Sequence, residues 1–115
     1  MLLTLLVSMF GFGKAAAQQA YAQYTESNAT LTFKYDSNYL TGQTYQLNSG
    51  KTDPGWYTDE TYKKIERVVF ETSFASVRPT STYRWFYYME KLNEIVGLDN
   101  FNTSEVTNMD WMFSH

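Results

Sequence analysis

Cysteine is absent from this chain of 115 residues, and it has only one histidine and two prolines. The absence of cysteine excludes disulfides, thiolate metal sites and cysteine nucleophiles. The one histidine, His115, is the last residue of the sequence, so we expect no histidine base fixed beside a nucleophile. Histidine ligands at the spacing that zinc requires are also lacking. The sequence therefore predicts no catalytic residues, no metal site and no cofactor.

Basic residues are few as well: nine Lys and Arg stand against twelve Asp and Glu, which gives a net charge of -3 at pH 7. They are scattered, and Lys63-Lys64 is the only adjacent pair. A nucleic-acid partner is excluded on this ground, because a phosphate-binding surface needs clustered Lys and Arg. Aromatic residues, in contrast, are abundant, with ten Tyr, eight Phe and three Trp. This composition is typical of a β-rich protein that is secreted or lies on the cell surface.

The N-terminal segment has the pattern of a secretion signal. Residues 1–10 form an uncharged and mostly apolar run, and the alanines at positions 15–17 provide small residues for cleavage after Ala17. The run is too short for a transmembrane helix, which needs about 20 apolar residues. We therefore predict a signal peptide over residues 1–17; the alternative is a short buried helix of the mature fold.

Residues 18–80 have the alternation of a small β-rich unit. The runs 20–24 and 30–35 predict a hairpin, because apolar and polar residues alternate on both sides of the turn residues Ser27-Asn28. Further short strands are expected at residues 45–47 and 65–70. Between them, residues 48–55 form a loop that ends in Pro54-Gly55, a strong turn dipeptide.

Residues 81–115 predict a helix, a strand and a second helix. Thr80 or Ser81 is a candidate N-cap for a helix over residues 83–91, and residues 94–96 predict a very short strand. Asn108 is a candidate N-cap for a helix over residues 109–113. The Trp-Phe pair at residues 85–86 aligns with the Met-Phe pair at residues 112–113, and this internal offset suggests a repeat.

A family resemblance rests on the sequence FNTSEVTNMDWMF at residues 101–113. Together with the apolar positions Phe86, Met89, Leu92 and Ile95, it resembles the repeat of the BspA-like leucine-rich-repeat surface proteins of bacteria. Residues 29–36, 54–57 and 78–82 are similar to the region before the first repeat of such proteins. Met89 stands where the family usually has a cysteine.

The resemblance implies a small β-rich N-terminal cap (18–80) that leads into the first unit of a leucine-rich-repeat solenoid (81–115, truncated), an α+β fold class. It implies a fragment of a secreted adhesion protein without catalysis. Its partners would be proteins, either host matrix proteins or other bacterial surface proteins. One alternative is a purely structural solenoid cap.

The other alternative is a carbohydrate-binding module, for which Trp56 and Tyr57 are the candidate residues. Their rings could form an exposed stacking platform for a sugar, or they could lie in the core, which we favour because a small domain without disulfides needs large aromatics inside. Asp53, Asp59 and Glu60 lack the spacing of a calcium loop and are interpreted as a solvated acidic loop.

Overall fold

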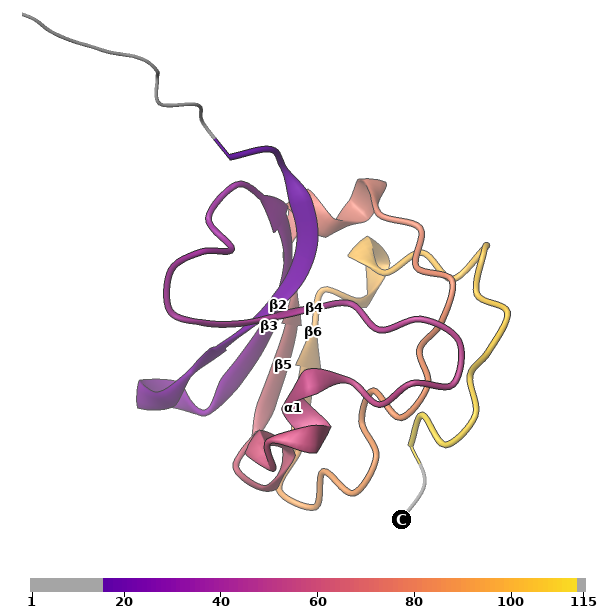
Figure 1. Cartoon of the computed structure of the whole chain (residues 1–115). Coiled ribbons are helices and arrows are strands. Elements are labelled where there is room, and N and C mark those ends of the chain that lie inside the picture. Colours follow the sequence, from indigo (N-terminus) through magenta and orange to yellow (C-terminus); the bar gives the residue numbers. More distant parts are fainter. Residues whose placement is uncertain (1–15, 114–115) are drawn as a thin grey trace, which may run out of the picture.

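The computed structural model describes residues 16–113. The predicted signal peptide therefore lies outside the described residues except for Ala16 and Ala17. Within residues 16–113, no helix is long and apolar enough to cross a membrane. The described chain forms a single sheet with short helical turns and loops packed against it (Figure 1).

The sheet has five strands in the order β4-β2-β3-β5-β6. Their bounds are Gln19–Thr25 for β2, Thr30–Asp36 for β3, Gln43–Gln46 for β4, Arg67–Phe70 for β5 and Glu94–Val96 for β6. Strands β4, β2 and β3 pair antiparallel, whereas β3, β5 and β6 pair parallel. Strand β3 therefore joins an antiparallel half of the sheet to a parallel half.

The predicted hairpin is confirmed as β2 and β3. Their register pairs Ala22 with Phe33 and Tyr24 with Leu31, and all four of these side chains are buried. A single 3-10 turn, η1 (Glu26–Asn28), connects the strands, and Ala29 follows it in the left-handed conformation with φ 52°. The predicted strands in the regions of residues 45–47, 65–70 and 94–96 are also present, as β4, β5 and β6.

Parallel strands need long connections, and these connections carry the helical turns. The chain between β4 and β5 contains α1 (Gly55–Thr58) and η2 (Thr61–Lys63). After β5 comes η3 (Thr72–Ser76), and after β6 comes η4 (Leu98–Asn100). The longest of these turns, η3, has only 5 residues.

The internal offset between residues 85–86 and residues 112–113 reappears as backbone pairing. Strand β6 pairs with β5 so that Glu94 lies beside Arg67, and Ser81 forms a parallel bridge with Asn108. Arg84 and Trp111 are as far apart in the sequence as Trp85 and Met112, and both have a left-handed backbone conformation, with φ 55° and 61°. Residues 67–86 and 94–113 thus run side by side in parallel, at the end of the sheet that β6 closes.

The helices expected at residues 83–91 and 109–113 are wrong; both stretches are turns and extended chain. In a helix each N–H donates to the carbonyl four residues earlier. Here the N–H groups of Thr82, Arg84 and Phe86 instead donate to the carbonyls of residues 108, 110 and 112 in the paired segment, at 2.8–3.1 Å. Pairing across segments has therefore replaced the local helix.

The expected fold class is also wrong. We expected an α+β cap that leads into the first unit of a leucine-rich-repeat solenoid, but the structure is a small β-rich fold built on one mixed sheet. The reason is that β6 pairs directly with β5 and so joins the sheet of the preceding residues.

The core consists mainly of aromatic side chains around Phe33 in β3. The Phe33 ring stacks on Phe70 and Trp85, with centroid distances of 4.8 and 4.7 Å. It also makes edge contacts with Trp56 and Phe74 at 5.5 and 5.6 Å. All five side chains are essentially inaccessible to solvent. Phe33 therefore joins strands, connections and the 80–86 segment in one cluster.

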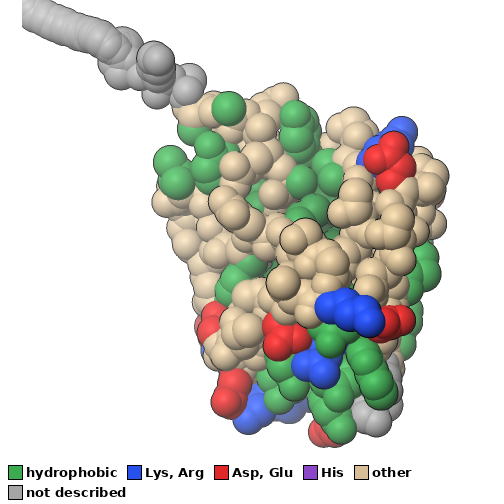
Figure 2. All heavy atoms as spheres, turned by 45° about the vertical axis from the view of Figure 1, so that its right-hand side comes forward, with side chains coloured by type: hydrophobic (Ala, Val, Ile, Leu, Met, Phe, Trp, Pro, Cys, Tyr) green, Lys and Arg blue, Asp and Glu red, His purple; other side chains and the backbone are tan. Residues whose placement is uncertain are grey.

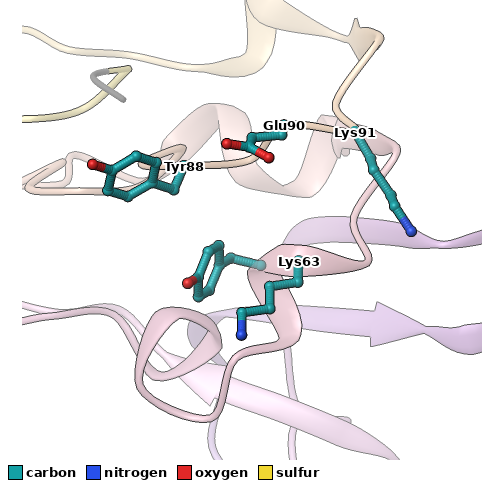
Figure 3. Close-up of a pocket in the computed structure, with 5 residues that line it drawn as sticks. Lys63, Tyr88, Glu90 and Lys91 are labelled. Atoms are coloured by element: carbon teal, nitrogen blue, oxygen red, sulfur yellow. The ribbon is translucent and has the colours of Figure 1, made fainter.

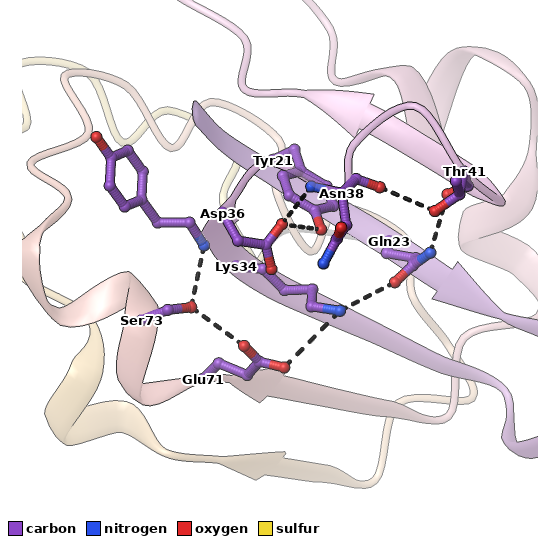
Figure 4. Close-up of polar contacts among 9 residues, drawn as sticks. Tyr21, Gln23, Lys34, Asp36, Asn38, Thr41, Glu71 and Ser73 are labelled. Atoms are coloured by element: carbon purple, nitrogen blue, oxygen red, sulfur yellow. Dashed lines mark hydrogen bonds and ion pairs between the residues drawn. The ribbon is translucent and has the colours of Figure 1, made fainter. Parts of the chain in front are cut away.

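A polar network lies beside the antiparallel half of the sheet (Figure 4). The Tyr21 hydroxyl donates to Asp36 Oδ1 at 2.6 Å, and the Asn38 N–H donates to the same oxygen at 2.8 Å. Lys34 Nζ donates to the Gln23 side chain at 3.2 Å, and Gln23 in turn donates to the Thr41 carbonyl. These bonds hold the loop after β3 against the sheet.

Replacing Phe33 with alanine should lower the free energy of unfolding by about 3–5 kcal/mol, since the change leaves a cavity at the centre of the cluster. Urea unfolding followed by tryptophan fluorescence measures the loss. Leu40→Ala is the control, because Leu40 is 77% exposed and its truncation should change stability by less than about 0.5 kcal/mol. Equal losses in the two variants would contradict the central role of Phe33.

Removing the hydroxyl in Tyr21→Phe should raise the pKa of Asp36. The hydrogen bond from Tyr21 is the main cause that holds the pKa of Asp36 below its ordinary value. A lowered pKa means that this contribution to stability is complete above the ordinary pKa and disappears as the pH falls through the lowered one. The free energy of unfolding of the variant should therefore be about 1 kcal/mol lower at pH 7. It should also fall less than that of the unaltered chain as the pH becomes acidic.

Carboxyl NMR titration and unfolding at several pH values measure both effects. Tyr39→Phe is the matched control, since the Tyr39 ring packs against Tyr21 at 6.1 Å. An unchanged pKa of Asp36 in Tyr21→Phe would contradict the prediction.

Candidate binding surface

Trp56, the first candidate for a sugar platform, lies in the core. Its ring contacts Phe33, Tyr45 and Trp85, and its Nε1–H donates to the Trp85 carbonyl at 2.7 Å. No part of its side chain reaches the surface. The preference for burial is thus confirmed for Trp56, and its ring is not available to stack on a ligand.

Tyr57, the second candidate, is half-buried and belongs to a group of aromatic side chains at the surface. We call this group the aromatic ribbon; it consists of Tyr62, Tyr57, Tyr87, Tyr88 and Trp111. Tyr57 stacks on Tyr62 at 4.8 Å and contacts Tyr87 at 5.5 Å. Tyr87 contacts Tyr88 at 4.5 Å and Trp111 at 6.0 Å. Figure 2 shows hydrophobic side chains gathered at the lower end of the molecule, the end at which α1 lies in Figure 1.

Three regions far apart in the sequence supply the ribbon: residues 57–62, residues 87–88 and Trp111. Tyr57 comes from α1, which begins after Pro54 where Gly55 lets the chain pass close to Tyr45; a Cβ on Gly55 would lie 2.6 Å from that ring. Tyr62 comes from η2, whose first N–H, that of Thr61, donates to Asp59 Oδ1 at 3.0 Å. The remaining members lie in, or directly after, the two segments that pair in parallel.

Arg84 fixes the middle of the ribbon. Its guanidinium carbon lies 4.6 Å from the Tyr87 ring centre, 5.5 Å from that of Tyr57 and 5.2 Å from that of Tyr83, and Nη1 donates to Asp53 Oδ1 at 3.1 Å. Its buried Nε has no hydrogen-bond partner among the described residues. The rings therefore provide much of the stabilisation of this charge, as cation–π contacts do. Burial tends to lower the pKa of Arg84, but the surrounding tyrosines and Asp53 raise it overall, so the cation is permanent.

Bulky residues in the left-handed region are uncommon, and this surface has three. Arg84, Tyr88 and Trp111 have φ values of 55°, 57° and 61°. Residues without glycine's freedom hold such a backbone only where surrounding contacts impose it, and such strain clusters at functional sites.

A groove of about 530 Å³ opens beside the ribbon, between η2 and residues 88–91 (Figure 3). It is lined by Tyr62, Lys63, Tyr88, Glu90 and Lys91. Its size lies within the range of small-ligand sites, about 300–1,000 Å³. The lining combines aromatic walls with one carboxylate and two ammonium groups.

The acidic side chain next to this surface acts as a hydrogen-bond acceptor. Asp59 accepts hydrogen bonds from Tyr45 at 2.6 Å and from the Thr61 backbone. Burial tends to raise the pKa of Asp59, but these hydrogen bonds lower it overall, so Asp59 is an acceptor and not an acid at pH 7. Among residues 16–113, no group of three or more His, Asp or Glu side chains could hold a metal ion. The expectation that the chain has no catalytic residue stays a prediction.

Sequence reasoning found Tyr57 but missed Arg84, Tyr62 and Tyr88. The high tyrosine content was a visible signal, yet it did not identify which tyrosines meet. Their contact depends on the parallel pairing of residues 80–86 with residues 107–112, which the helix predictions had obscured.

Replacing Arg84 with glutamine should lower the free energy of unfolding by about 1–2 kcal/mol, because the cation–π contacts and the bond to Asp53 are lost together. Arg84→Lys should retain part of this stability because it keeps the positive charge, but not all of it, because the ammonium lacks the planar face of the guanidinium. Urea unfolding gives the stability, and NMR shifts of the Tyr57 and Tyr87 rings report the local change. Arg78→Gln is the control, because the hydrogen bonds of Arg78 within residues 16–113 go to the backbone carbonyls of Ala75 and Val77. An Arg84→Gln variant as stable as Arg78→Gln would contradict the assignment.

Comparison of the chain with protein-family models, curated proteins and solved structures finds no match. The likeness to BspA-like leucine-rich-repeat proteins therefore stays a resemblance that rests on residues 101–113 and the shorter motifs before them.

Proposed function

We propose that this chain is a non-catalytic protein-interaction module that works outside the cell in adhesion, and that it binds its partner through residues 94–113. The observation that carries the proposal is that four large apolar side chains are exposed along this segment, which we call its apolar face. Leu98, Met109, Trp111 and Phe113 are between 50% and 59% exposed. Two of them lie close together, because Trp111 is 6.0 Å from Tyr87 and Phe113 is 5.1 Å from the neighbouring Phe86. Exposed apolar side chains that gather in this way are characteristic of interaction sites.

The edge of the sheet supports the same location. Strand β6 is the last strand of the order, so one side of its backbone has no strand beside it among the described residues. An open edge can bind an extended segment of another protein through backbone hydrogen bonds. The apolar face and the open edge thus belong to the same segment, which suits a partner that covers both.

Charge indicates what kind of partner fits. From residue 92 to residue 113 the chain carries Glu94, Asp99, Glu105 and Asp110 but no Lys or Arg. Glu94 pairs with Arg67 at 2.9 Å, and Asp110 lies 3.9 Å from Lys51. No ion pair is recorded for Asp99 or Glu105 with any described residue, and both side chains are exposed. A partner with an apolar patch surrounded by Lys and Arg is therefore complementary to this face.

The resemblance of residues 101–113 to bacterial surface repeats supports an extracellular protein partner, as does the secretion pattern of residues 1–17. The carbohydrate alternative loses Trp56 as a candidate because that ring is buried.

Binding to purified collagen and laminin, measured by surface plasmon resonance, tests the proposal. The double variant Leu98→Ser and Met109→Ser should weaken binding at least tenfold, the effect of losing more than about 1.4 kcal/mol of contact energy. Binding should also weaken as the salt concentration rises, because the exposed carboxylates Asp99 and Glu105 are screened.

Leu40→Ser is the matched control, since Leu40 is exposed in the loop before β4, at the opposite edge of the sheet. Equal weakening by this control would contradict the location. If sedimentation shows a dimer that the double variant abolishes, the face binds a second copy of the chain and the proposed partner class is wrong.

A further inference from the structure

The groove between η2 and residues 88–91 has a second set of features, and no residue of 94–113 lines it. Tyr88 and Tyr62 supply its aromatic walls. Tyr88 is 38% exposed, so it offers ring surface to a ligand. Tyr62 is held in place because Tyr57 stacks on it at 4.8 Å with an interplanar angle of 26°.

Tyr88 is placed there at the cost of backbone strain. Its φ of 57° belongs to the left-handed region, where glycine or asparagine is favoured over an aromatic residue. The turn that contains it is fixed by neighbours on both sides: Phe86 and Met89 are buried, and the Phe86 N–H donates to the Met112 carbonyl at 2.8 Å. The position of Tyr88 is therefore built into the fold.

The charged groups of the groove are available to a ligand. No hydrogen bond or ion pair is recorded for the Glu90 carboxylate or the Lys91 ammonium with any described residue, whereas Lys63 pairs with Glu60 at 2.6 Å. Figure 3 shows the side chains of Tyr88, Glu90 and Lys91 along one side of the groove and Lys63 on the other. The groove thus presents an acceptor, Glu90, next to the Tyr88 ring, and a donor, Lys91, at the end of the groove away from that ring.

We propose that this groove binds a saccharide, with one sugar ring stacked on Tyr88 and bonded by Glu90, and a further ring bonded by Lys91. A pyranose has an apolar face of C–H groups, which packs on an aromatic ring, and hydroxyls that both donate and accept. Glu90 accepts from a hydroxyl of the stacked ring, and Lys91 donates to a hydroxyl of the further ring. The volume of about 530 Å³ leaves room for more than a single ring.

Other ligand classes fit the groove less well. A phosphate group would meet Lys91 and Lys63, but Lys63 already pairs with Glu60, Glu90 would repel the phosphate, and no arginine lines the groove. An apolar peptide would bury Glu90 and Lys91 without partners, which is costly. A saccharide satisfies both charges and uses the aromatic wall.

Heteronuclear NMR with oligosaccharides of glucose, mannose and N-acetylglucosamine at millimolar concentration tests the proposal on the whole chain. At least one of the three should shift the signals of Tyr62, Tyr88, Glu90 and Lys91. Tyr88→Ala should weaken that binding about tenfold or more, whereas Tyr88→Phe should retain it within about threefold, because the ring face stays. Glu90→Gln and Lys91→Met should each weaken it several-fold.

Lys51→Met is the matched control for charge, because Lys51 is exposed and lies outside the groove lining; it should leave sugar binding unchanged. The double variant Leu98→Ser and Met109→Ser should also bind sugar normally, so that loss of protein binding and loss of sugar binding are distinguishable. The proposal is overturned if none of the three sugars shifts the groove signals, if the shifts lie elsewhere, or if Tyr88→Ala binds as well as the unaltered chain.

Discussion

The stacking of Phe33 between Phe70 and Trp85 is the contact on which the rest of the structure depends. These rings come from β3, from β5 and from the segment after η3, with centroid distances of 4.8 and 4.7 Å. A chain without cysteine has no covalent cross-link to hold two parallel crossovers against a sheet. Large aromatic side chains replace that link, because each buries a large apolar area with a defined ring geometry. Trp56, first considered as a ligand platform, belongs to the same cluster, and its Nε1–H bond to the Trp85 carbonyl satisfies the one polar atom of its ring.

Local sequence patterns predicted the antiparallel half of the fold well. The alternation through residues 30–35 and the turn residues before it predict a hairpin, because antiparallel neighbours in a hairpin are also neighbours in sequence. Strand Glu94–Val96 was predicted with its observed bounds. The parallel half could not be predicted in this way. Its partners, such as Arg67 and Glu94, lie far apart in the sequence. The apolar spacing from Phe86 to Ile95 suits a helix as well as it suits turns that pack against a neighbouring segment.

The candidate binding surface follows from that same parallel pairing. Tyr87 and Trp111 come into contact because residues 82–86 pair with residues 108–112, and Arg84 and Trp111 share the left-handed backbone conformation. One geometric feature therefore has two consequences. On the inner side the paired segments place Trp85 and Phe86 in the core, and on the outer side they present tyrosines and Arg84 to solvent. The sequence of one segment shows which of its residues belong to the core, but it does not show which tyrosines of different segments meet at the surface.

The two proposed surfaces differ in what holds them, and this difference bears on how each could bind. The groove at Tyr88 lies against buried residues and against tyrosines stacked on a fixed cation, so its aromatic walls are in place before a ligand arrives, and only Glu90 and Lys91 have to become ordered on binding. The face of residues 94–113 has the core on one side only, and its strand, β6, is three residues long. A partner that adds to β6 would complete hydrogen bonds along the open edge and cover Leu98 and Met109 together. Binding there would stabilise the outermost segment of the sheet, whereas a sugar in the groove would leave the stability of that segment nearly unchanged.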